Sequence, residues 1–482
     1  MNPLLTVQVI GIYSMIFGAT LIGPILVGLI YWEAETLHFL WPMAACLGVG
    51  SLLFVAGRRR PHRELGVRDG YLIVTLFWVL LSTLGAWPLM IALDLAPVDA
   101  LFESTSGLTT TGATVITGLD SLPRCVLFYR QQLQWYGGMG LVVLGVAVMP
   151  MLGIGGMQLY RAEAPGPLKD EKLTPRLVHT AQALWLIYLG LTAACALGYW
   201  LAGMSVFDAV AHSLSTLSTG GFSTHDASMG YYQSPGIEAV SILFMLLAAI
   251  NFGVHYVAWV RQDPWIYLRD VEAHAFLVFV LGVVIIVGLI LRVEVPHATF
   301  VESLRGASFT VVSVITSTGF GTVDFAHWPD FLPVLMIYIS FVGGCGGSTA
   351  GGMKVLRVLL MVKQGTHEVR RLVHPHAQFP IRLGKRVVQP DLARSVWGFF
   401  ALYTAALGIL TLLMIHAGLA PLDAFSAVAT SMNNMGPGLG EVAYNFQGVS
   451  DFGKLLAVMG MLLGRLEILT ILVILSPGFW AR

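Results

Sequence analysis

Four short segments of the chain end in polar residues followed by glycine, a pattern that can present main-chain oxygens to a cation. Glycine permits backbone angles that turn successive carbonyl groups to one side without a side-chain clash. Rings of such carbonyls replace the hydration shell of the ion in potassium-channel filters. Aligned on the glycine, the four endings are Thr110-Thr111-Gly112, Ser218-Thr219-Gly220, Ser317-Thr318-Gly319 and Asn434-Met435-Gly436. Because Met435 stands where the other endings have a hydroxyl residue, the pattern favours a filter made by the backbone.

Each ending follows about twelve residues with the pattern of a short helix. A single glycine at such a place is also typical of an ordinary helix C-cap, and for any one copy this alternative stays open. The four glycines are spaced 108, 99 and 117 residues apart, which suits a span, a short re-entrant helix, a return span and a link. Four copies, each between paired apolar stretches, indicate a repeated pore unit.

The physics of the bilayer explains why a short helix and turn would be repeated. Backbone that leaves the helical state at membrane depth is tolerated only inside protein or beside water. A pore helix that ends near the middle of the membrane points its partially negative carboxyl end at that water, which favours a cation there. Asp99, Asp208 and Asp423 stand at the start of three of these helices, where we expect them to cap free N–H groups.

The elements that position the four segments are long apolar stretches. The chain has 482 residues, of which 56% are hydrophobic and 11% charged, and its mean hydropathy is +0.76, so it belongs in a bilayer. Stretches of about 20 apolar residues or more lie near 4–32, 36–56, 70–95, 128–155, 178–203, 236–260, 273–292, 331–362, 395–417 and 453–476. We therefore predict an all-α polytopic membrane protein with ten transmembrane helices.

The order of these stretches predicts two leading helices and four span, pore helix, span repeats around a pseudo-fourfold pore. The expected divisions are 1–66 for the leading helices, then 67–176, 177–270, 271–390 and 391–482 for the four repeats. Basic residues gather in the connections after the even-numbered spans, so the positive-inside rule predicts that both termini are cytoplasmic. The net charge of zero gives no reason to expect a nucleic-acid partner.

Two features within predicted spans suggest a gate. The first is a glycine-rich stretch in the eighth span, which should break the helix into an intramembrane loop, although glycines in spans also serve close helix packing. Its residues are Gly343, Gly344, Gly346, Gly347, Ser348, Thr349, Gly351 and Gly352. The second is Arg465 in the last span, where a buried charge needs water or a partner. It is expected to repel cations on the axis; the alternative is a structural ion pair with Glu467 or another carboxylate.

These segments together resemble the Trk/Ktr/HKT superfamily of potassium transporters, most closely its bacterial TrkH membrane-subunit branch. Further matches are the stretches from Arg130 to Gly140 and from Gly343 to Gly352, and the resemblance covers essentially the whole chain. It implies that Gly112 marks a potassium-preferring member, since sodium-preferring members carry serine there. It also implies a gating loop in the third repeat and a pore arginine matching Arg465.

The resemblance further implies a multi-pass protein of the bacterial inner membrane, surrounded by lipid, that forms a homodimer. A cytosolic nucleotide-binding regulatory subunit of the TrkA type is the expected partner, and the basic segment from Lys363 to Arg394 offers it a docking surface. Potassium is the expected ion, and no organic cofactor is expected in this chain.

The function expected from these observations is gated, channel-like uptake of potassium. The alternative is a secondary symporter that couples potassium to sodium or protons, although alternating access favours inverted repeats and these repeats share one orientation. An enzyme is not expected, because no cluster of acids, histidines or cysteines suggests a catalytic cavity.

Overall fold

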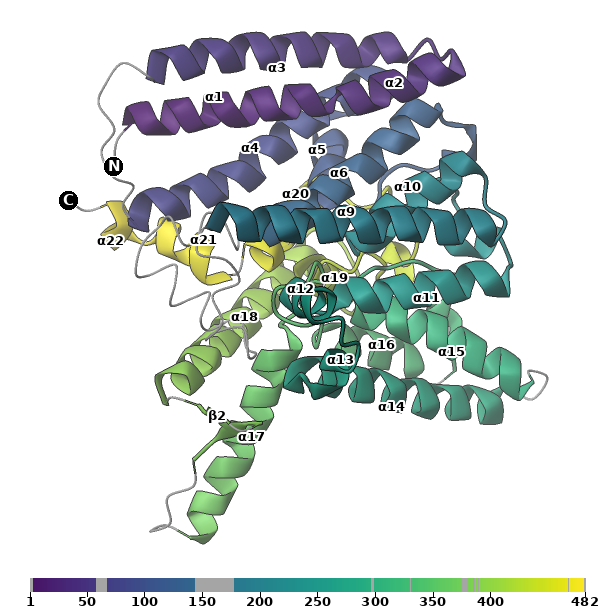
Figure 1. Ribbon diagram of the computed structural model, residues 1–482, viewed down its shortest axis with the longest axis vertical. Coiled ribbons are helices and arrows are strands. Elements are labelled where there is room, and N and C mark those ends of the chain that lie inside the picture. The colour runs from purple at the N-terminus through teal and green to yellow at the C-terminus, as the bar shows by residue number, and fades with distance from the viewer. Residues whose placement is uncertain are drawn as a thin grey trace.

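The computed structural model is built almost entirely of helices (Figure 1). It describes residues 3–57, 67–143, 177–295, 299–329, 331–374, 380–384, 386–388, 390–466 and 468–480. Several of the basic residues used to orient the chain, including Arg58 and Lys169, lie outside the described residues. So do the predicted boundaries at 66 and 176 between the first three divisions.

The chain begins with a pair of helices on one edge of the molecule (Figure 1). α1 (Pro3–Thr20) continues into α2 (Ile22–Tyr31), and α3 (Thr36–Gly57) returns along α1. Glycines let the two backbones approach closely: a Cβ atom at Gly11 would lie 2.7 Å from the carbonyl oxygen of Gly50. Small residues at such crossings are typical of helices packed in a membrane.

Four short helices lie inside the molecule, each between two other helices. They are α5 (Pro97–Leu108), α10 (Val206–Leu217), α15 (Phe300–Ile315) and α19 (Pro421–Asn433). The helices before them are α4 (Val67–Leu93), α9 (Leu177–Leu201), α14 (Val271–Glu294) and α18 (Pro390–His416). Those after them are α6 (Arg124–Val143), α11 (Pro235–Ala249), α16 (Leu332–Ser340) and α20 (Asp451–Arg465). This alternation follows the order that the sequence predicts.

The starts of the short helices differ from the prediction. Asp99, Asp208 and Asp423 are each the third residue of their helix, and none is the N-cap. Asp99 instead pairs with Lys454 at 2.6 Å, and Ser205 caps α10 by accepting a hydrogen bond from the Asp208 N–H. The capping prediction was therefore wrong. α5 and α19 begin with proline, which has no N–H to cap.

Six described helices are long and apolar enough to span a membrane. They are Thr6–Tyr31, Thr36–Gly57, Arg68–Leu93, Gln182–Leu201, Val271–Glu294 and Ala393–His416. A seventh arises if α11 and α12 (Phe252–Arg261) count as one span bent by 98°. The predicted spans 331–362 and 453–476 are broken, and 128–155 leaves the described residues after Val143. The total of ten thus stays a prediction.

The bend between α11 and α12 corrects the continuous span predicted over 236–260. Asn251 starts a new helix, because its side-chain oxygen accepts from the Gly253 N–H at 2.7 Å. His255 bridges helices, from the Leu247 carbonyl at 2.9 Å to the Tyr267 hydroxyl of α13 (Ile266–Arg269) at 2.8 Å.

The remaining helices and the two strands follow α16 or α20 in the chain. α17 (Val355–Val373) projects from the helix body, with the antiparallel strands β1 (Arg382–Leu383) and β2 (Arg386–Val387) beside it (Figure 1). α21 (Ile468–Leu475) and α22 (Pro477–Trp480) follow the break after α20. Single 3-10 turns occur at Leu119–Ser121, Ser228–Tyr231, Phe325–His327 and Gly440–Val442.

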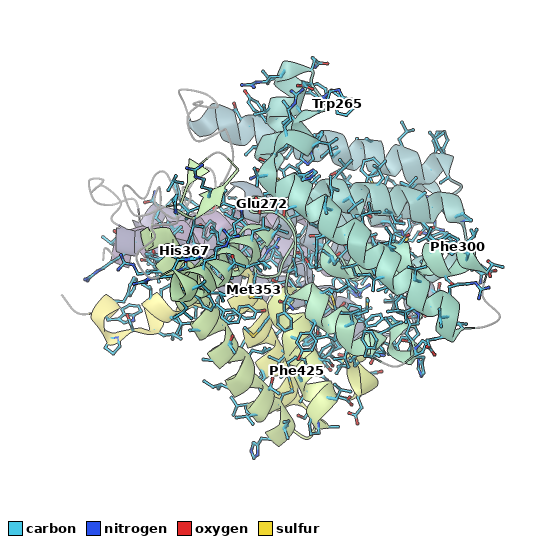
Figure 2. All side chains as sticks on the ribbon, turned by 90° about the horizontal axis from the view of Figure 1, so that it is seen from below. Trp265, Glu272, Phe300, Met353, His367 and Phe425 are labelled. Carbon is cyan, nitrogen blue, oxygen red and sulfur yellow. The ribbon has the colours of Figure 1, made fainter. Side chains whose placement is uncertain are left out.

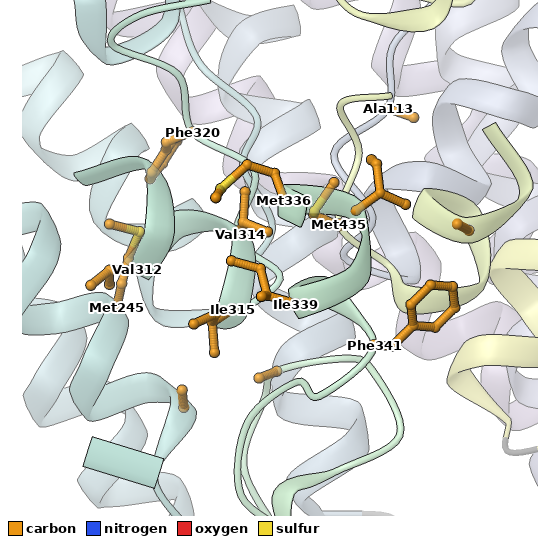
Figure 3. Packing of buried hydrophobic residues seen from close by; sticks show 14 of the residues in the cluster. Ala113, Met245, Val312, Val314, Ile315, Phe320, Met336, Ile339, Phe341 and Met435 are labelled. Carbon is orange, nitrogen blue, oxygen red and sulfur yellow. The ribbon is translucent and has the colours of Figure 1, made fainter. Parts of the chain in front are cut away.

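The largest hydrophobic core surrounds three of the short helices, α10, α15 and α19. In Figure 3, Met435 lies among apolar side chains that include Val314 of α15 and Met336 of α16. Met435 and Met336 have no exposed side-chain surface, and Val314 is 3% exposed. The Met435 side chain is thus a core residue, which fits the interpretation that its turn acts through the backbone.

Candidate ion pathway

The four turns after the short helices share one backbone conformation. In each, a residue with a left-handed backbone is followed two positions later by a left-handed glycine. The pairs are Thr110 with Gly112, Thr219 with Gly221, Ser317 with Gly319, and Asn434 with Gly436. The residue between them donates its N–H to the carbonyl five residues earlier, as from Thr111 to Ser106 at 2.8 Å and from Met435 to Thr430 at 2.9 Å.

This conformation corrects the alignment of the second segment by one residue. Gly221, with φ +81°, is the counterpart of Gly112, Gly319 and Gly436, whereas Gly220 matches Thr111. The sequence offers two consecutive glycines there, so residue type alone could not assign the left-handed position. Sequence reasoning therefore missed Gly221, although Gly220 still lies in the turn.

The turns meet one another in a closed cycle. A Cβ atom added to Gly112 would collide with the main-chain oxygen of Gly220, and one on Gly221 with that of Thr318. In the same way, Gly319 faces the oxygen of Met435, and Gly436 faces that of Thr111 at 2.7 Å from an added Cβ. The first turn thus contacts the second, the second the third, the third the fourth, and the fourth the first.

A cavity of about 310 Å³ opens on one side of this cycle, lined by all four left-handed glycines. The polar side chains of the turns mostly bond within the protein. Ser218 donates back to the Leu214 carbonyl at 2.8 Å, and the Asn434 amide donates to the Thr111 hydroxyl at 3.0 Å and the Met461 carbonyl at 3.1 Å. Thr219 and Thr318 are likewise buried. The turns are held by their own hydroxyl and amide groups.

A buried ion pair beside the cavity supports the first two turns and was not singled out from the sequence. Arg130 of α6 is 1% exposed and Glu103 of α5 is fully buried, and their side chains meet at 2.7 Å. Glu103 also accepts from the Val115 N–H at 2.9 Å, and Arg130 donates to the Ser223 carbonyl at 3.3 Å. The pair thus ties together the segments that follow both turns.

Gln134, one helical turn after Arg130, supports the second turn directly. Its amide donates to the Gly220 carbonyl at 2.6 Å, and its oxygen accepts from the Ser215 hydroxyl at 2.7 Å and the Phe222 N–H at 3.1 Å. Two polar residues four positions apart at the start of an apolar stretch were the available signal, because that spacing puts both on one helix face.

The glycine-rich stretch lies against the ends of the short helices. The chain leaves the helical state after α16 and resumes it at Val355, with left-handed glycines at Gly343, Gly347 and Gly352. We call residues 343–352 the glycine loop. The first half of the loop also contains Gly344 and Gly346. Ser348 and Thr349 are buried, and the Ser348 hydroxyl donates to the Cys345 carbonyl at 2.6 Å.

The glycine loop contacts the ends of three of the short helices. The Thr349 hydroxyl is within hydrogen-bond distance of the Leu217 carbonyl at 3.0 Å and the Ala248 carbonyl at 3.1 Å. The Gly351 N–H donates to the Ser317 hydroxyl at 2.5 Å, and the Gly352 N–H to the Asn433 carbonyl at 3.1 Å. Leu217, Ser317 and Asn433 all lie where a short helix ends, so the loop sits beneath the cycle of turns.

Arg465 at the end of α20 reaches the same loop. It is 3% exposed and donates to the Thr349 carbonyl at 2.9 Å and the Gly137 carbonyl at 3.3 Å. Within the part of the chain that the structure describes, Arg465 forms no ion pair; Glu467, the partner weighed from the sequence, lies outside it. Its guanidinium is therefore held by main-chain oxygens of the loop and of α6.

On the cavity side, a histidine joins the outer segments of the first two repeats. His225 approaches Asp120 at 2.5 Å and stacks on Tyr231 with ring centroids 3.6 Å apart. Burial disfavours the charged ring, but hydrogen bonds and charges of Asp208 and Asp120 outweigh it and raise the pKa of His225. The hydrogen bond from His225 in turn lowers the pKa of Asp120.

Comparison with known proteins decides the family. Residues 39–480 match the TrkH family, described as cation transport protein. The Trk system potassium uptake protein TrkH of Vibrio parahaemolyticus is 48% identical over 478 residues, 98% of each chain. The chain belongs to the TrkH family. Its relatives include TrkH of Escherichia coli strain K12, 46% identical over 98% of each chain, and TrkG of the same strain, 41% identical over 98% of this chain and 97% of TrkG.

The solved structures agree with this assignment. The crystal structure of the potassium transporter TrkH from Vibrio parahaemolyticus matches with a TM-score of 0.92 and 45% identity over 100% of both chains. Membership of the TrkH family confirms the superfamily resemblance and the prediction of a transport protein rather than an enzyme. With its apolar helices, it also makes the chain a multi-pass membrane protein.

Proposed function

We propose that this TrkH-family chain takes up potassium through a single gated pore, with the cycle of four turns as its selectivity filter. The observation that carries the proposal is the closed order of contacts from Gly112 through Gly221, Gly319 and Gly436. Turns that share one backbone conformation and contact one another in cyclic order support an arrangement around one axis. The names of the relatives, Trk system potassium uptake proteins, supply the ion.

In this proposal a potassium ion enters from the 310 Å³ cavity and loses its water among the main-chain oxygens of the turns. The carboxyl ends of the four short helices point their partial negative charge at the same region and favour a cation there. The deeply buried side chains of Thr110, Thr111 and Ser218 position the backbone. Aligned on the left-handed glycines, the turns read Thr-Thr-Gly, Thr-Gly-Gly, Ser-Thr-Gly and Asn-Met-Gly, so the filter would be irregular.

The gate in this proposal is the glycine loop together with Arg465. Both lie at the helix ends, on the far side of the turns from the cavity, and Arg465 donates to the loop itself. A positive charge there opposes the passage of a cation at short range, where little water screens it. Opening then requires a movement that carries the loop and Arg465 off the axis.

The wider architecture belongs to the same proposal. It comprises ten spans arranged as two leading helices and four repeats, with the divisions given above, in a homodimer of the bacterial inner membrane whose termini are cytoplasmic. A cytosolic nucleotide-binding subunit of the TrkA type would act on the basic segment from Lys363 to Arg394. α17, which projects from the helix body, begins that region (Figure 1).

The deciding experiment is cation flux into proteoliposomes for Gly112→Ser. An added Cβ at Gly112 collides with the Gly220 oxygen and displaces two adjacent turns, so we expect at least a tenfold loss of potassium preference over sodium, about 1.4 kcal/mol. The control is Gly118→Ser. Gly118 shares the left-handed backbone, with φ +75°, but an added Cβ there meets only the Ser121 hydroxyl at 3.6 Å.

Unchanged selectivity in Gly112→Ser would remove Gly112 from the filter, and an equal loss in Gly118→Ser would assign the effect to backbone strain. Single-channel recording separates the pore from the symporter alternative. Unitary currents above the turnover of a carrier require an open pore, whereas flux that depends on a sodium or proton gradient would favour symport.

A further inference from the structure

Glu272, a buried carboxylate near the start of α14, contacts both the glycine loop and the helix that follows it. Its side chain is 3% exposed. One carboxylate oxygen accepts from the Gly346 N–H at 2.8 Å and from the Leu356 N–H at 3.2 Å. Figure 2 labels Glu272 near the middle of the view, and Met353, the residue after the glycine loop, lies near the middle as well. A carboxyl group this deeply buried needs such partners.

Glu272 lies on α14, a helix that capping and packing hold in place. The Asp270 side chain caps α14 by accepting from the Glu272 N–H at 3.1 Å and the Ala273 N–H at 2.9 Å. α14 then runs as a 24-residue helix against α15. Ala273 and Phe276, next on the helix, are buried in the main core. Glu272 therefore keeps its position when neighbouring segments move.

The two donors that Glu272 holds belong to the moving parts of the proposed gate. Gly346 is in the middle of the glycine loop, and Leu356 is in the first turn of α17, where backbone N–H groups have no partner inside the helix. The residue before α17, Lys354, makes no side-chain cap. Glu272 supplies that cap from another helix, and a carboxyl oxygen is a favourable acceptor at the positive end of α17.

We propose that Glu272 is a positioning residue that holds the glycine loop closed and couples it to α17. The inference rests on the proposed gate. Because Gly346 and Leu356 share one carboxylate oxygen, a displacement of α17 loosens the loop as well. The loop also contains Thr349, whose carbonyl accepts a hydrogen bond from Arg465. Loss of the contact between Glu272 and the loop therefore also loosens Arg465. α17 projects from the helix body (Figure 1), so a regulator that moves α17 also disturbs this contact.

The test uses Cys345, which lies in the glycine loop beside Gly346 and is fully buried. The other three cysteines, Cys46, Cys125 and Cys195, are also buried and are replaced by alanine in the full-length protein. The rate at which a water-soluble thiol reagent labels Cys345 then reports how often the loop opens. Potassium flux without any regulator is measured on the same proteoliposomes.

We expect Glu272→Gln to speed the labelling of Cys345 about tenfold and to raise basal flux, because the neutral amide oxygen is a weaker acceptor. Glu272→Asp is a second variant that keeps the charge but withdraws it by one methylene; it should show the same changes. The control is Glu294→Gln, since Glu294 lies exposed at the other end of α14. It should leave labelling and flux unchanged.

Unchanged labelling in both Glu272 variants would overturn the inference. Faster labelling with unchanged basal flux would support the role of Glu272 in holding the loop, and would count against the loop as the gate. The two proposals therefore fail in different measurements. Labelling that rises equally in Glu294→Gln would show a general loosening of α14 and would also overturn the inference.

Discussion

The two sides of the cycle of turns are held by different kinds of contact. On the cavity side, opposite charges bind each other: Arg130 meets Glu103 at 2.7 Å, and both also bond the neighbouring backbone. On the loop side, Arg465 and Glu272 bond main-chain groups. Arg465 donates to carbonyl oxygens, and Glu272 accepts from N–H groups.

This difference suggests which side is rigid. Removing one member of a buried ion pair leaves an unpaired charge and costs about 3–5 kcal/mol. A charged group bonded to a neutral main-chain group contributes about 1.5–3 kcal/mol, and other carbonyl or N–H groups can replace the partner. The cavity side should therefore keep its shape during transport, whereas the loop side can exchange partners and move.

The largest effect expected from this comparison is on stability. Arg130→Ala should lower the free energy of unfolding by about 3–5 kcal/mol, because Glu103 is left charged and fully buried. Thermal unfolding in detergent measures it. The matched control is Arg305→Ala: Arg305 pairs with Glu238 at 2.6 Å but is 39% exposed, so water replaces much of the lost contact.

If both variants lose equal stability, the two ion pairs are equivalent and the cavity side has no special rigidity. A double change, Arg130→Met with Glu103→Leu, sharpens the test. It removes both charges together and should recover much of the stability that Arg130→Ala loses.

The second largest effect expected is that of the Arg465 charge on basal potassium flux. Arg465→Ala should raise basal potassium flux about tenfold without changing selectivity, since one charge-assisted bond to the Thr349 carbonyl is lost. Arg465→Lys keeps the charge and should remain closer to the parent. A well-folded Arg465→Ala protein with unchanged or reduced flux would favour a purely structural arginine.

A smaller change is expected from the loop hydroxyl. Thr349→Val keeps the shape of the side chain but removes its donor to the Leu217 and Ala248 carbonyls, worth about 1 kcal/mol. Basal flux should rise roughly fivefold. Ser348→Ala is the control, because among the residues that the structure describes the partner of the Ser348 hydroxyl is the Cys345 carbonyl of the same loop. If the two variants behave alike, the contact of the loop with the second repeat does not hold the gate.

The smallest effect concerns pH on the cavity side. The raised pKa of His225 means that its attraction to Asp120 is complete at pH values below the ordinary histidine pKa and is lost as pH rises through the raised pKa. The loss should stay below about 1 kcal/mol, because Asp120 is 51% exposed. The hydrogen-exchange protection factors of residues 117–122, which are corrected for the intrinsic pH dependence of exchange, should therefore fall as pH rises above the ordinary histidine pKa. Asp120→Asn should abolish most of that dependence; an equal dependence in this variant would exclude the pair.

Much of the candidate pathway could be predicted from the sequence. The left-handed glycines of three turns, the helix break in the third repeat and the burial of Arg465 all follow from local rules of glycine geometry and charge in a bilayer. The assignment of Gly221 over Gly220 could not be predicted, because either glycine fits the conformation. Glu272 also escaped notice, since a polar residue near a helix start is ordinary.

The sequence by itself determined the class of the molecule, the glycine turns, the helix break at the glycine loop and the burial of Arg465, because hydropathy, repetition and glycine act over short stretches of chain. Only the tertiary structure decided that the turns contact one another in a cycle, that Arg130 pairs with Glu103, and that Glu272 reaches the glycine loop. Glu272 and Gly346 are 74 residues apart in the chain. Contacts of that kind depend on how helices pack, which no local pattern of residues encodes.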